Sequence, residues 1–415
     1  MRNSLKLMSI FAVLSILLCG CGDTTENIYG NGSDVSTAEI ISRNSSNTEP
    51  ENFQKVQALT DFNEEVQKFH IDLDLLKNNG TNAYLLGLNR KYYYFYTYDD
   101  KNDYYFTINR KDDSMKSFFQ VPLSNDTFFQ EVYGDDLLVG YGDWDAHNTC
   151  HFHLISVTPY GTEKQLLRYD TSGYPTCSLT GHYIVLNCIK TELIDSEKTA
   201  EKGNAIVIVI DLESGNEKEI ITTNFQRDTP VYDGTIIPDS QGWSDGSGFC
   251  YEKVNLSNES YEDDNAGTCG IYYYSFADDT TKKLMDFPYK LLYIRGDDNC
   301  FITSDYLLDS GDNSGKITLK ENGVYHSYEI PGIVSGEDVI NSYKLSDENI
   351  LIYNHTHFWI YNLKDKTYYD EKFKYSNSPE DYVCLNMRVG DNEFAYVQPD
   401  EDEIIIHLFT STDIK

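Results

Sequence analysis

The feature that most constrains the fold is a unit of one β run, a polar turn and a second β run, which recurs along the chain. It is clearest in "AIVIVIDLESGNEKEIITT", Ala205 to Thr223. Each unit lies between further runs in which Tyr, Phe, Ile, Val and Thr alternate, a pattern typical of strands and not of helices. The turn centres recur about 42 to 64 residues apart, which is the spacing of blade repeats. Similar turns occur in "RKDDSMKSFF", "TPYGTEKQLLRY", "FADDTTKKLMDF", "LKENGVYHSYEI" and "NLKDKTYYDEKF".

Laid out as four strands per unit, the repeats fill most of the chain. The last unit has only three strand-like runs, so a closed ring needs its fourth strand from elsewhere. The segment "VQKFHIDL", Val66 to Leu73, precedes the first repeat and could supply that strand. The pattern therefore predicts an all-β domain over residues 56–415, a seven-bladed β-propeller of four-stranded blades with its ring closed by an N-terminal strand. The units are expected at 81–121, 126–169, 172–222, 229–287, 288–331, 334–374 and 381–410.

One of these units carries a family resemblance. "IVIVIDLESG", Ile206 to Gly215, resembles the outer hairpin of TolB-like and WD-repeat-like β-propellers, and "FWIYNLKDK" and "IYYYSFADD" are weaker matches. No Trp-Asp signature recurs at the ends of the units. The resemblance implies a binding platform, and a fold alone does not specify an activity.

The first twenty residues have the features of a secretion signal. Arg2 and Lys6 precede the apolar run Leu7–Leu18, which is too short to span a bilayer comfortably. The run ends in "LCGC", which resembles the lipobox of bacterial lipoproteins. The resemblance implies cleavage before Cys21, with lipid on its thiol and on the freed amine. The protein would then be anchored to the cell membrane, facing away from the cytoplasm; an ordinary secreted protein is the alternative.

The segment after the signal, residues 21–55, is rich in Ser, Thr, Asn, Gly and Glu and has no apolar period. Such a composition buries too little apolar surface to offset chain entropy, so we expect a flexible tether.

The chain is strongly acidic. Its net charge is −34, and removal of the signal, with its two positive residues, makes it −36. Phosphate binding needs clustered positive charge, so nucleic acid is excluded as a partner.

The cysteines do not form an evident disulfide framework. Nine cysteines become seven when Cys19 is removed with the signal and Cys21 is lipidated. Seven is odd, so at least one thiol stays unpaired or pairs between molecules. Cys250 and Cys269 flank one acidic loop and could bridge a hairpin.

Thirty-four tyrosines, dense in "KYYYFYTYDDKNDYYF", suggest a sugar-binding surface at first sight. Stacked blades bury both faces of each sheet and need wide, flat side chains, so core packing is the favoured interpretation.

One stretch matches a catalytic pattern. Gly242 to Gly246, "GWSDG", fits the G-x-S-x-G motif with Ser244 as nucleophile. A nucleophile elbow needs a strand before the serine and a helix after it, and here the strand-like "SGFCYEKVN" follows. No Walker loop, dinucleotide fingerprint or EF-hand loop occurs, so the sequence predicts no catalytic residue and no cofactor.

A possible metal site lies in "GDWDAHNTCHFH". His147, His151 and His153, with Cys150 and nearby aspartates, are good zinc ligands. Their spacing fits no standard zinc module, so hydrogen-bonded residues on a strand and its loop are the favoured alternative.

Long loops should gather on one face of the disc. The second-to-third connections of four units are long, and so is the connection between units from Asn224 to Gly246. Long loops on a rigid scaffold are where ligands usually bind. We therefore expect Trp144 and Trp243 to border one concave site, or else to fold down as plugs of their own loops. The predicted ligand-binding residues are Asp143, Trp144, Asp145, Trp243, Asp245, Tyr261, Asp263, Asp264 and Asp309.

The sequence thus favours a membrane-anchored, non-catalytic propeller that binds a protein, peptide or glycan. A structural subunit of an envelope complex is the first alternative, and a hydrolase that uses Ser244 is the second.

Overall fold

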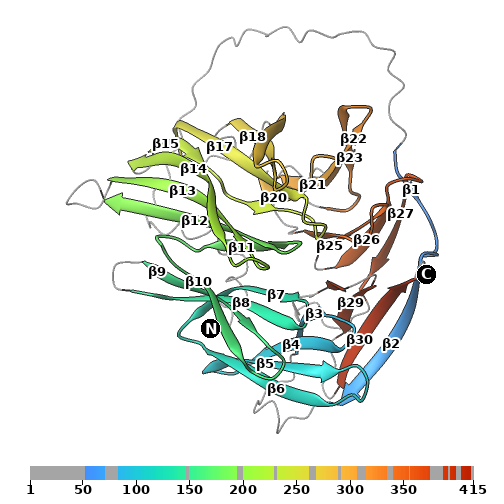
Figure 1. The fold of residues 1–415 in the computed structure, drawn as a ribbon. Coiled ribbons are helices and arrows are strands. Elements are labelled where there is room, and N and C mark those ends of the chain that lie inside the picture. Colours follow the sequence, from blue (N-terminus) through green and yellow to red (C-terminus); the bar gives the residue numbers. More distant parts are fainter. Residues whose placement is uncertain are drawn as a thin grey trace, which may run out of the picture.

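The computed structural model is an all-β ring of sheets, and no helix occurs in the residues that it describes (Figure 1). We also find, among those residues, no helix with the length and apolar character that a membrane crossing requires. The structure describes residues 52–70, 83–145, 149–193, 200–228, 231–260, 268–287, 291–305, 315–333, 340–354, 356–373, 387–390, 393–398 and 403–412.

The first two repeat units form separate antiparallel sheets, and their order in the chain is their order in each sheet. The strands are β3 (Tyr84–Leu88), β4 (Tyr92–Tyr98), β5 (Asn102–Asn109) and β6 (Met115–Pro122), then β7 (Asp126–Tyr133), β8 (Asp136–Trp144), β9 (Cys150–Val157) and β10 (Glu163–Thr171).

The last three units also form separate sheets. Their strands are β20 (Leu291–Gly296), β21 (Cys300–Asp305), β22 (Gly315–Glu321) and β23 (Val324–Glu329), then β24 (Asn341–Lys344), β25 (Asn349–Tyr353), β26 (His357–Asn362) and β27 (Thr367–Lys372), then β28 (Arg388–Gly390), β29 (Glu393–Gln398) and β30 (Glu403–Ser411).

The third and fourth units are joined into one nine-stranded sheet. Their long strands extend past the other blades, and β15 hydrogen-bonds to β14 on one side and to β17 on the other. The prediction of seven separate blades is therefore wrong: five sheets are separate blades, and the sixth holds two units. The strands are β11 (Thr176–Thr180), β12 (Tyr183–Leu193), β13 (Ala200–Asp211), β14 (Glu217–Asp228), β15 (Val231–Ile236), β16 (Ser240–Gln241), β17 (Gly248–Ser260), β18 (Thr268–Ser275) and β19 (Thr280–Phe287).

The ring is closed by an N-terminal strand, as the sequence predicts. The strand β2 (Phe62–His70) pairs antiparallel with β30 and completes the last sheet. Its bounds differ from the predicted Val66–Leu73, and residues 71–73 lie outside the described part. Arg110, between β5 and β6, ties the first unit to the last by a bidentate ion pair with Glu393 on β29.

Folded structure begins before the predicted end of the tether. The short strand β1 (Gln54–Lys55) pairs parallel with β27 and adds a fifth strand to that sheet. The ring of Phe53 packs edge-on against Tyr328 and Tyr361, which come from two neighbouring units. Residues 52–55 therefore belong to the body of the protein.

The hydrophobic clusters join successive units: most join two, the one around Trp243 joins three, and one joins the last unit to the first. On β4, the side chains of Tyr93, Tyr94 and Phe95 are fully buried. The Tyr94 hydroxyl reaches the rim and donates to the carbonyl of Asp135, 2.6 Å away. The interpretation of the tyrosine-rich stretch as blade core is confirmed for this strand.

The proposed Cys250–Cys269 bridge is not formed, because Cys250 is a buried free thiol. Cys250 on β17 lies opposite Tyr273 of β18, whereas Cys269 of β18 lies opposite Val254, about four residues further along β17. The side chain of Cys269 is outside the described set.

Candidate functional site

Three of the predicted ligand-binding residues lie at the end of β8. Trp144 is half-buried: its Nε1 donates to Asp126 Oδ2 at 2.9 Å, and its ring packs edge-on against Tyr174. Asp145 accepts a hydrogen bond from the Thr149 backbone amide, while Asp143 is exposed. Trp144 thus packs against the start of β7 and the segment between β10 and β11. The remaining four polar loop positions, Tyr261, Asp263, Asp264 and Asp309, lie outside the described residues.

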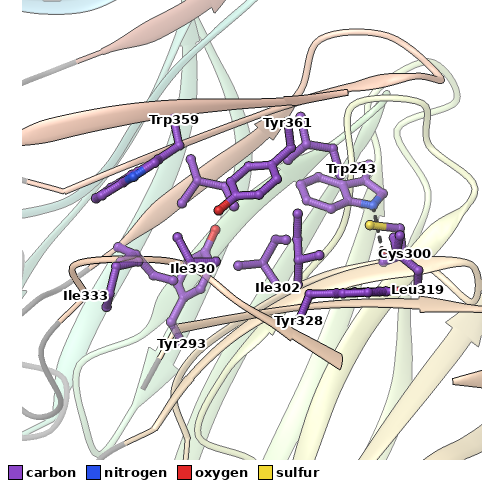
Figure 2. Packing of buried hydrophobic residues seen from close by; sticks show 14 residues of the cluster. Trp243, Tyr293, Cys300, Ile302, Leu319, Tyr328, Ile330, Ile333, Trp359 and Tyr361 are labelled. Carbon is purple, nitrogen blue, oxygen red and sulfur yellow. Dashed lines mark hydrogen bonds between the residues drawn. The ribbon is translucent and has the colours of Figure 1, made fainter. Parts of the chain in front are cut away.

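Trp243 is buried, with 1% of its surface exposed. Figure 2 shows its ring among Tyr361, Cys300 and Leu319, and its Nε1 donates to the carbonyl of Cys300 at 3.0 Å. The indole fills the gap between units and cannot contact a ligand without leaving the core. This outcome is the loop plug that the sequence left open as an alternative.

The two tryptophans do not share a face of the disc. Trp243 lies in the turn between β16 and β17, which is a first-to-second turn of its unit. Trp144 is the last residue of β8, whereas the first-to-second turn of its unit precedes the first residue of β8. A nine-residue strand separates these two ends of β8 by about 27 Å. The expectation of one site between them is therefore wrong. The sequence patterns did not show that β15 and β16 are strands. These strands lead the chain from one face of the disc to the opposite face before it reaches Trp243.

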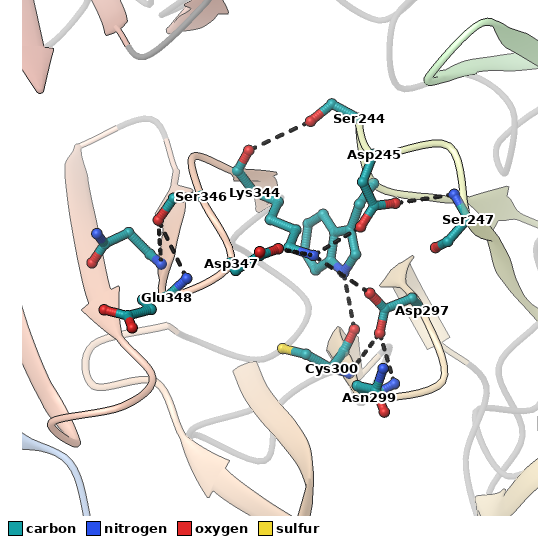
Figure 3. Close-up of polar contacts among 12 residues, drawn as sticks. Ser244, Asp245, Ser247, Asp297, Asn299, Cys300, Lys344, Ser346, Asp347 and Glu348 are labelled. Atoms are coloured by element: carbon teal, nitrogen blue, oxygen red, sulfur yellow. Dashed lines mark hydrogen bonds and ion pairs between the residues drawn. The ribbon is translucent and has the colours of Figure 1, made fainter. Parts of the chain in front are cut away.

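The turn around Trp243 is held by a network of ion pairs (Figure 3). Lys344 Nζ lies 2.8 Å from Asp245, 3.2 Å from Asp347 and 3.9 Å from Asp297. Burial disfavours the charged form of Lys344, but hydrogen bonding to Asp245 and the nearby carboxylates outweigh it and raise its pKa. Asp245 is thus committed to joining two units.

Ser244 lacks the surroundings of a nucleophile. It is exposed in the turn between β16 and β17, and a strand follows where a nucleophile elbow has a helix. Its Oγ donates to the carbonyl of Lys344 at 3.5 Å. Gly246 has a φ of 72°, in the left-handed region that favours glycine, so turn geometry explains that glycine.

The histidines of β9 have local partners. His151 Nδ1 lies 2.8 Å from Asp170, and this hydrogen bond raises the pKa of His151. The ring of His153 stacks on Tyr141. His147 lies outside the described residues, and within them no three metal-ligating side chains come together.

A different group of polar residues lies at the centre of the ring. The strands β28, β3, β7, β11, β16 and β20 lie beside one another in that order, so the first strands of the units surround a common axis. Four polar side chains on these first strands and on β24 lie one or two residues before a strand end, at a common level. We call them the axial site: Glu131, Arg295, Tyr343 and Arg388.

Arg295 is 8% exposed and connects three units. Its Nε donates to the carbonyl of Gly242 at 2.9 Å, and its guanidinium lies 4.7 Å from the ring centroid of Tyr343. The Tyr293 hydroxyl lies close to it as well. These contacts use a minority of the five N–H groups of an arginine.

Arg388 faces the same tyrosine. Its Nε donates to the carbonyl of Leu86 at 2.7 Å, and its Nη1 donates to the Tyr343 hydroxyl at 3.2 Å. Two guanidinium groups from different units therefore share one aromatic side chain.

Neither axial arginine has a direct acidic partner in the described part of the chain. Glu131 and Asp239 act electrostatically on Arg295, and Glu131 also acts on Arg388. No carboxylate oxygen of either acid comes within the 4.0 Å of an ion pair. Burial raises the pKa of Asp239 to about 6. Arg295 is buried and Arg388 is half-buried, so the axial site is a place of incompletely compensated positive charge in a protein of net charge −34.

Sequence reasoning missed the axial site. Its one signal is that "YIRGDD" and "NMRVGDN" place an arginine in the apolar first run of two units, just before Gly and Asp. An arginine in a run that should be buried is unusual, since charged residues are seldom fully buried without a partner.

Comparisons with known proteins give fold-level likeness only. No protein-family model and no curated protein matches the sequence. Solved structures with a similar course of the chain include the WD40 domain of coronin from Toxoplasma gondii, with 9% identity, a TM-score of 0.46 and coverage of 88% of this chain and 90% of that chain.

An oligogalacturonate lyase from Vibrio parahaemolyticus has 11% identity, a TM-score of 0.39 and coverage of 86% and 98%. TolB from Acinetobacter baumannii has 13% identity, a TM-score of 0.33 and coverage of 64% and 58%. The similar structures thus include WD40 and TolB β-propellers, the two types that the hairpin Ile206–Gly215 resembles. The chain itself is a β-propeller by the arrangement of its own sheets.

Proposed function

We propose that this protein is a membrane-anchored, extracytoplasmic binding protein that holds its ligand at the axial site and does not catalyse a reaction. The observation that carries the proposal is the pair Arg295 and Arg388, which lie at the centre of the ring and have, among the described residues, no acidic partner within 4.0 Å. Buried charges in proteins are normally paired, and an unpaired one is costly. A site that retains this cost is a candidate for binding a ligand.

The non-catalytic part of the proposal rests on the available side chains. The described side chains around the axial site include arginines, tyrosines, Glu131 and Asp239, and the Ser342 hydroxyl there is hydrogen-bonded to the Tyr293 hydroxyl, not to a base of the kind that acyl transfer requires. Ser244, the hydrolase candidate, hydrogen-bonds a backbone carbonyl instead.

The membrane anchor is proposed from the sequence around Cys21. The first described residues, which follow residue 51, dock at the outer edge of the ring, so an anchored N-terminus would leave the axis unobstructed by its own attachment. Replacing Cys21 with Ala should release the protein from the membrane fraction or leave it unprocessed. A variant that still partitions with detergent as a mature lipoprotein would contradict the anchor.

Binding is tested with the full chain in detergent, by thermal unfolding against a panel of peptides, glycans and small metabolites. We expect at least one compound to raise Tm in a saturable way, and the compound to be recovered unchanged. Conversion of the compound would favour an enzyme. Elution with a second protein at fixed stoichiometry, without any stabilising compound, would favour a structural subunit.

A further inference from the structure

We infer that the ligand of the axial site is a small oxyanion, a carboxylate or a phosphate, held between Arg295 and Arg388 with Tyr343 as a third donor. The inference rests on the proposed function and names the chemical class that this site takes.

The first step is the charge. Two guanidinium groups stay protonated at any physiological pH, and here both are directed at one tyrosine from different units. Desolvation of both guanidinium groups opposes folding of the empty site. A bound anion would offset this cost by pairing with their charge.

The second step is the inventory of donors. The Nη atoms of Arg295 and Nη2 of Arg388 have no carbonyl or carboxylate acceptor among the described residues. Because the Tyr343 hydroxyl accepts from Arg388, its own proton is left to donate. The free groups of the site are therefore all hydrogen-bond donors. An oxyanion fits them because it carries several acceptor oxygens.

The third step is that the missing acceptor atoms are not supplied by the neighbouring acids. Glu131 is partly exposed on β7, and the structure gives its carboxylate no ion pair with either arginine. A ligand that carries hydroxyl groups beside its charge would give Glu131 hydrogen-bond donors as well. The arrangement therefore favours an anion attached to a polar body.

The experiment measures binding to the full chain in detergent by calorimetry. The probes are glucuronate, citrate and inorganic phosphate at matched ionic strength, with glucose as the uncharged counterpart of glucuronate and sodium chloride as the salt control. The variants are Arg295→Gln, Arg388→Gln and Tyr343→Phe. Arg168→Gln is the matched control, because Arg168 is an exposed arginine on β10.

We expect saturable binding of at least one oxyanion and none of glucose or chloride. Each arginine variant should weaken the Kd at least tenfold, Tyr343→Phe by about threefold, and Arg168→Gln by less than twofold. Response to phosphate alone assigns a phosphate ligand, and response to glucuronate or citrate alone assigns a carboxylate.

The unfolding temperature of each variant without anion separates binding from folding, and only variants that unfold cooperatively are compared. No saturable response to any of the three anions overturns the inference. So does an equal loss in Arg168→Gln. An uncharged compound that stabilises the protein and is insensitive to Arg295→Gln would leave the binding function standing and remove the oxyanion.

Discussion

One half-buried arginine at the seam of this ring and two arginines at its axis have opposite kinds of partner. At the seam between the first and last units, Arg110 forms a bidentate ion pair with Glu393 and lies 4.9 Å from the ring centroid of Tyr93. At the axis, Arg295 and Arg388 reach carbonyls and tyrosines but no carboxylate of the described residues within ion-pair distance. At the seam, the ion pair of Arg110 stabilises the fold, whereas at the axis the charges of Arg295 and Arg388 are left for a ligand to pair with. The predictions below test this difference, beginning with the largest expected effect.

Removal of β2 should destabilise the ring most. Without Phe62–His70, the outer edge of β30 loses nine paired residues, and the two clusters that contain Phe62 and Phe69 are opened. We expect a fall in Tm on the order of 10 °C or more. A deletion of the same length before residue 50 is the control. Equal, negligible effects would contradict closure of the ring by this strand.

Arg110→Met should cost about 3–5 kcal/mol of unfolding free energy, because it leaves the buried Glu393 carboxylate unpaired. Chemical denaturation measures it. The double variant Arg110→Met with Glu393→Leu should recover part of the loss. A double variant as unstable as the sum of the two single changes would show that the pair itself is not the stabilising element.

Arg295→Met should cost less than half as much as Arg110→Met in the same assay. The variant gives up the hydrogen bond to Gly242 but also removes a buried charge that has no acidic partner within 4.0 Å in the described part of the chain. If Arg295→Met destabilises as strongly as Arg110→Met, the axial arginine is a structural staple and the contrast between the two regions disappears.

The smallest effect should be one of pH. Burial raises the pKa of Asp239 to about 6, above its value in the unfolded chain. The folded state therefore binds the proton more tightly, and the contribution of Asp239 to stability is full below about pH 4 and is lost as pH rises through about 6. The difference in Tm between Asp239→Asn and the parent should therefore shift in favour of the variant when the pH is raised from about 4.5 to about 8. A constant difference across that range would contradict the raised pKa.

The repeat units were predictable because alternation of apolar residues and polar turns is local. The strands of all units fall within or close to the expected ranges, and β2 closes the ring a few residues before its predicted place. The merger of two units was not predictable, because it depends on β15 pairing with β14 and β17 on its two sides. Such pairing is set by tertiary contacts and leaves no periodic signal.

The candidate site was harder to predict for the same reason. Trp243 lies among polar residues in the sequence, yet its ring fills a gap formed by strands about 50 to 120 residues later. Arg295 and Arg388 are about 90 residues apart and meet only because the ring brings their strands to one axis. Neither fact can be read from a local window.

The docking of β1 has a mechanical consequence for the proposed membrane anchor. Backbone hydrogen bonds from Gln54 and Val56, the Lys55–Asp370 ion pair and the packing of Phe53 hold this segment, whereas β2 beyond it is held along nine residues. A force on the N-terminus would act first on the docked segment around β1 and then on β2, so the weaker contacts of β1 would break first. Freeing residues 53–61 would extend the reach from the membrane by about 30 Å. The ring would stay closed during that step, so β1 would serve as a yielding link that protects the fold.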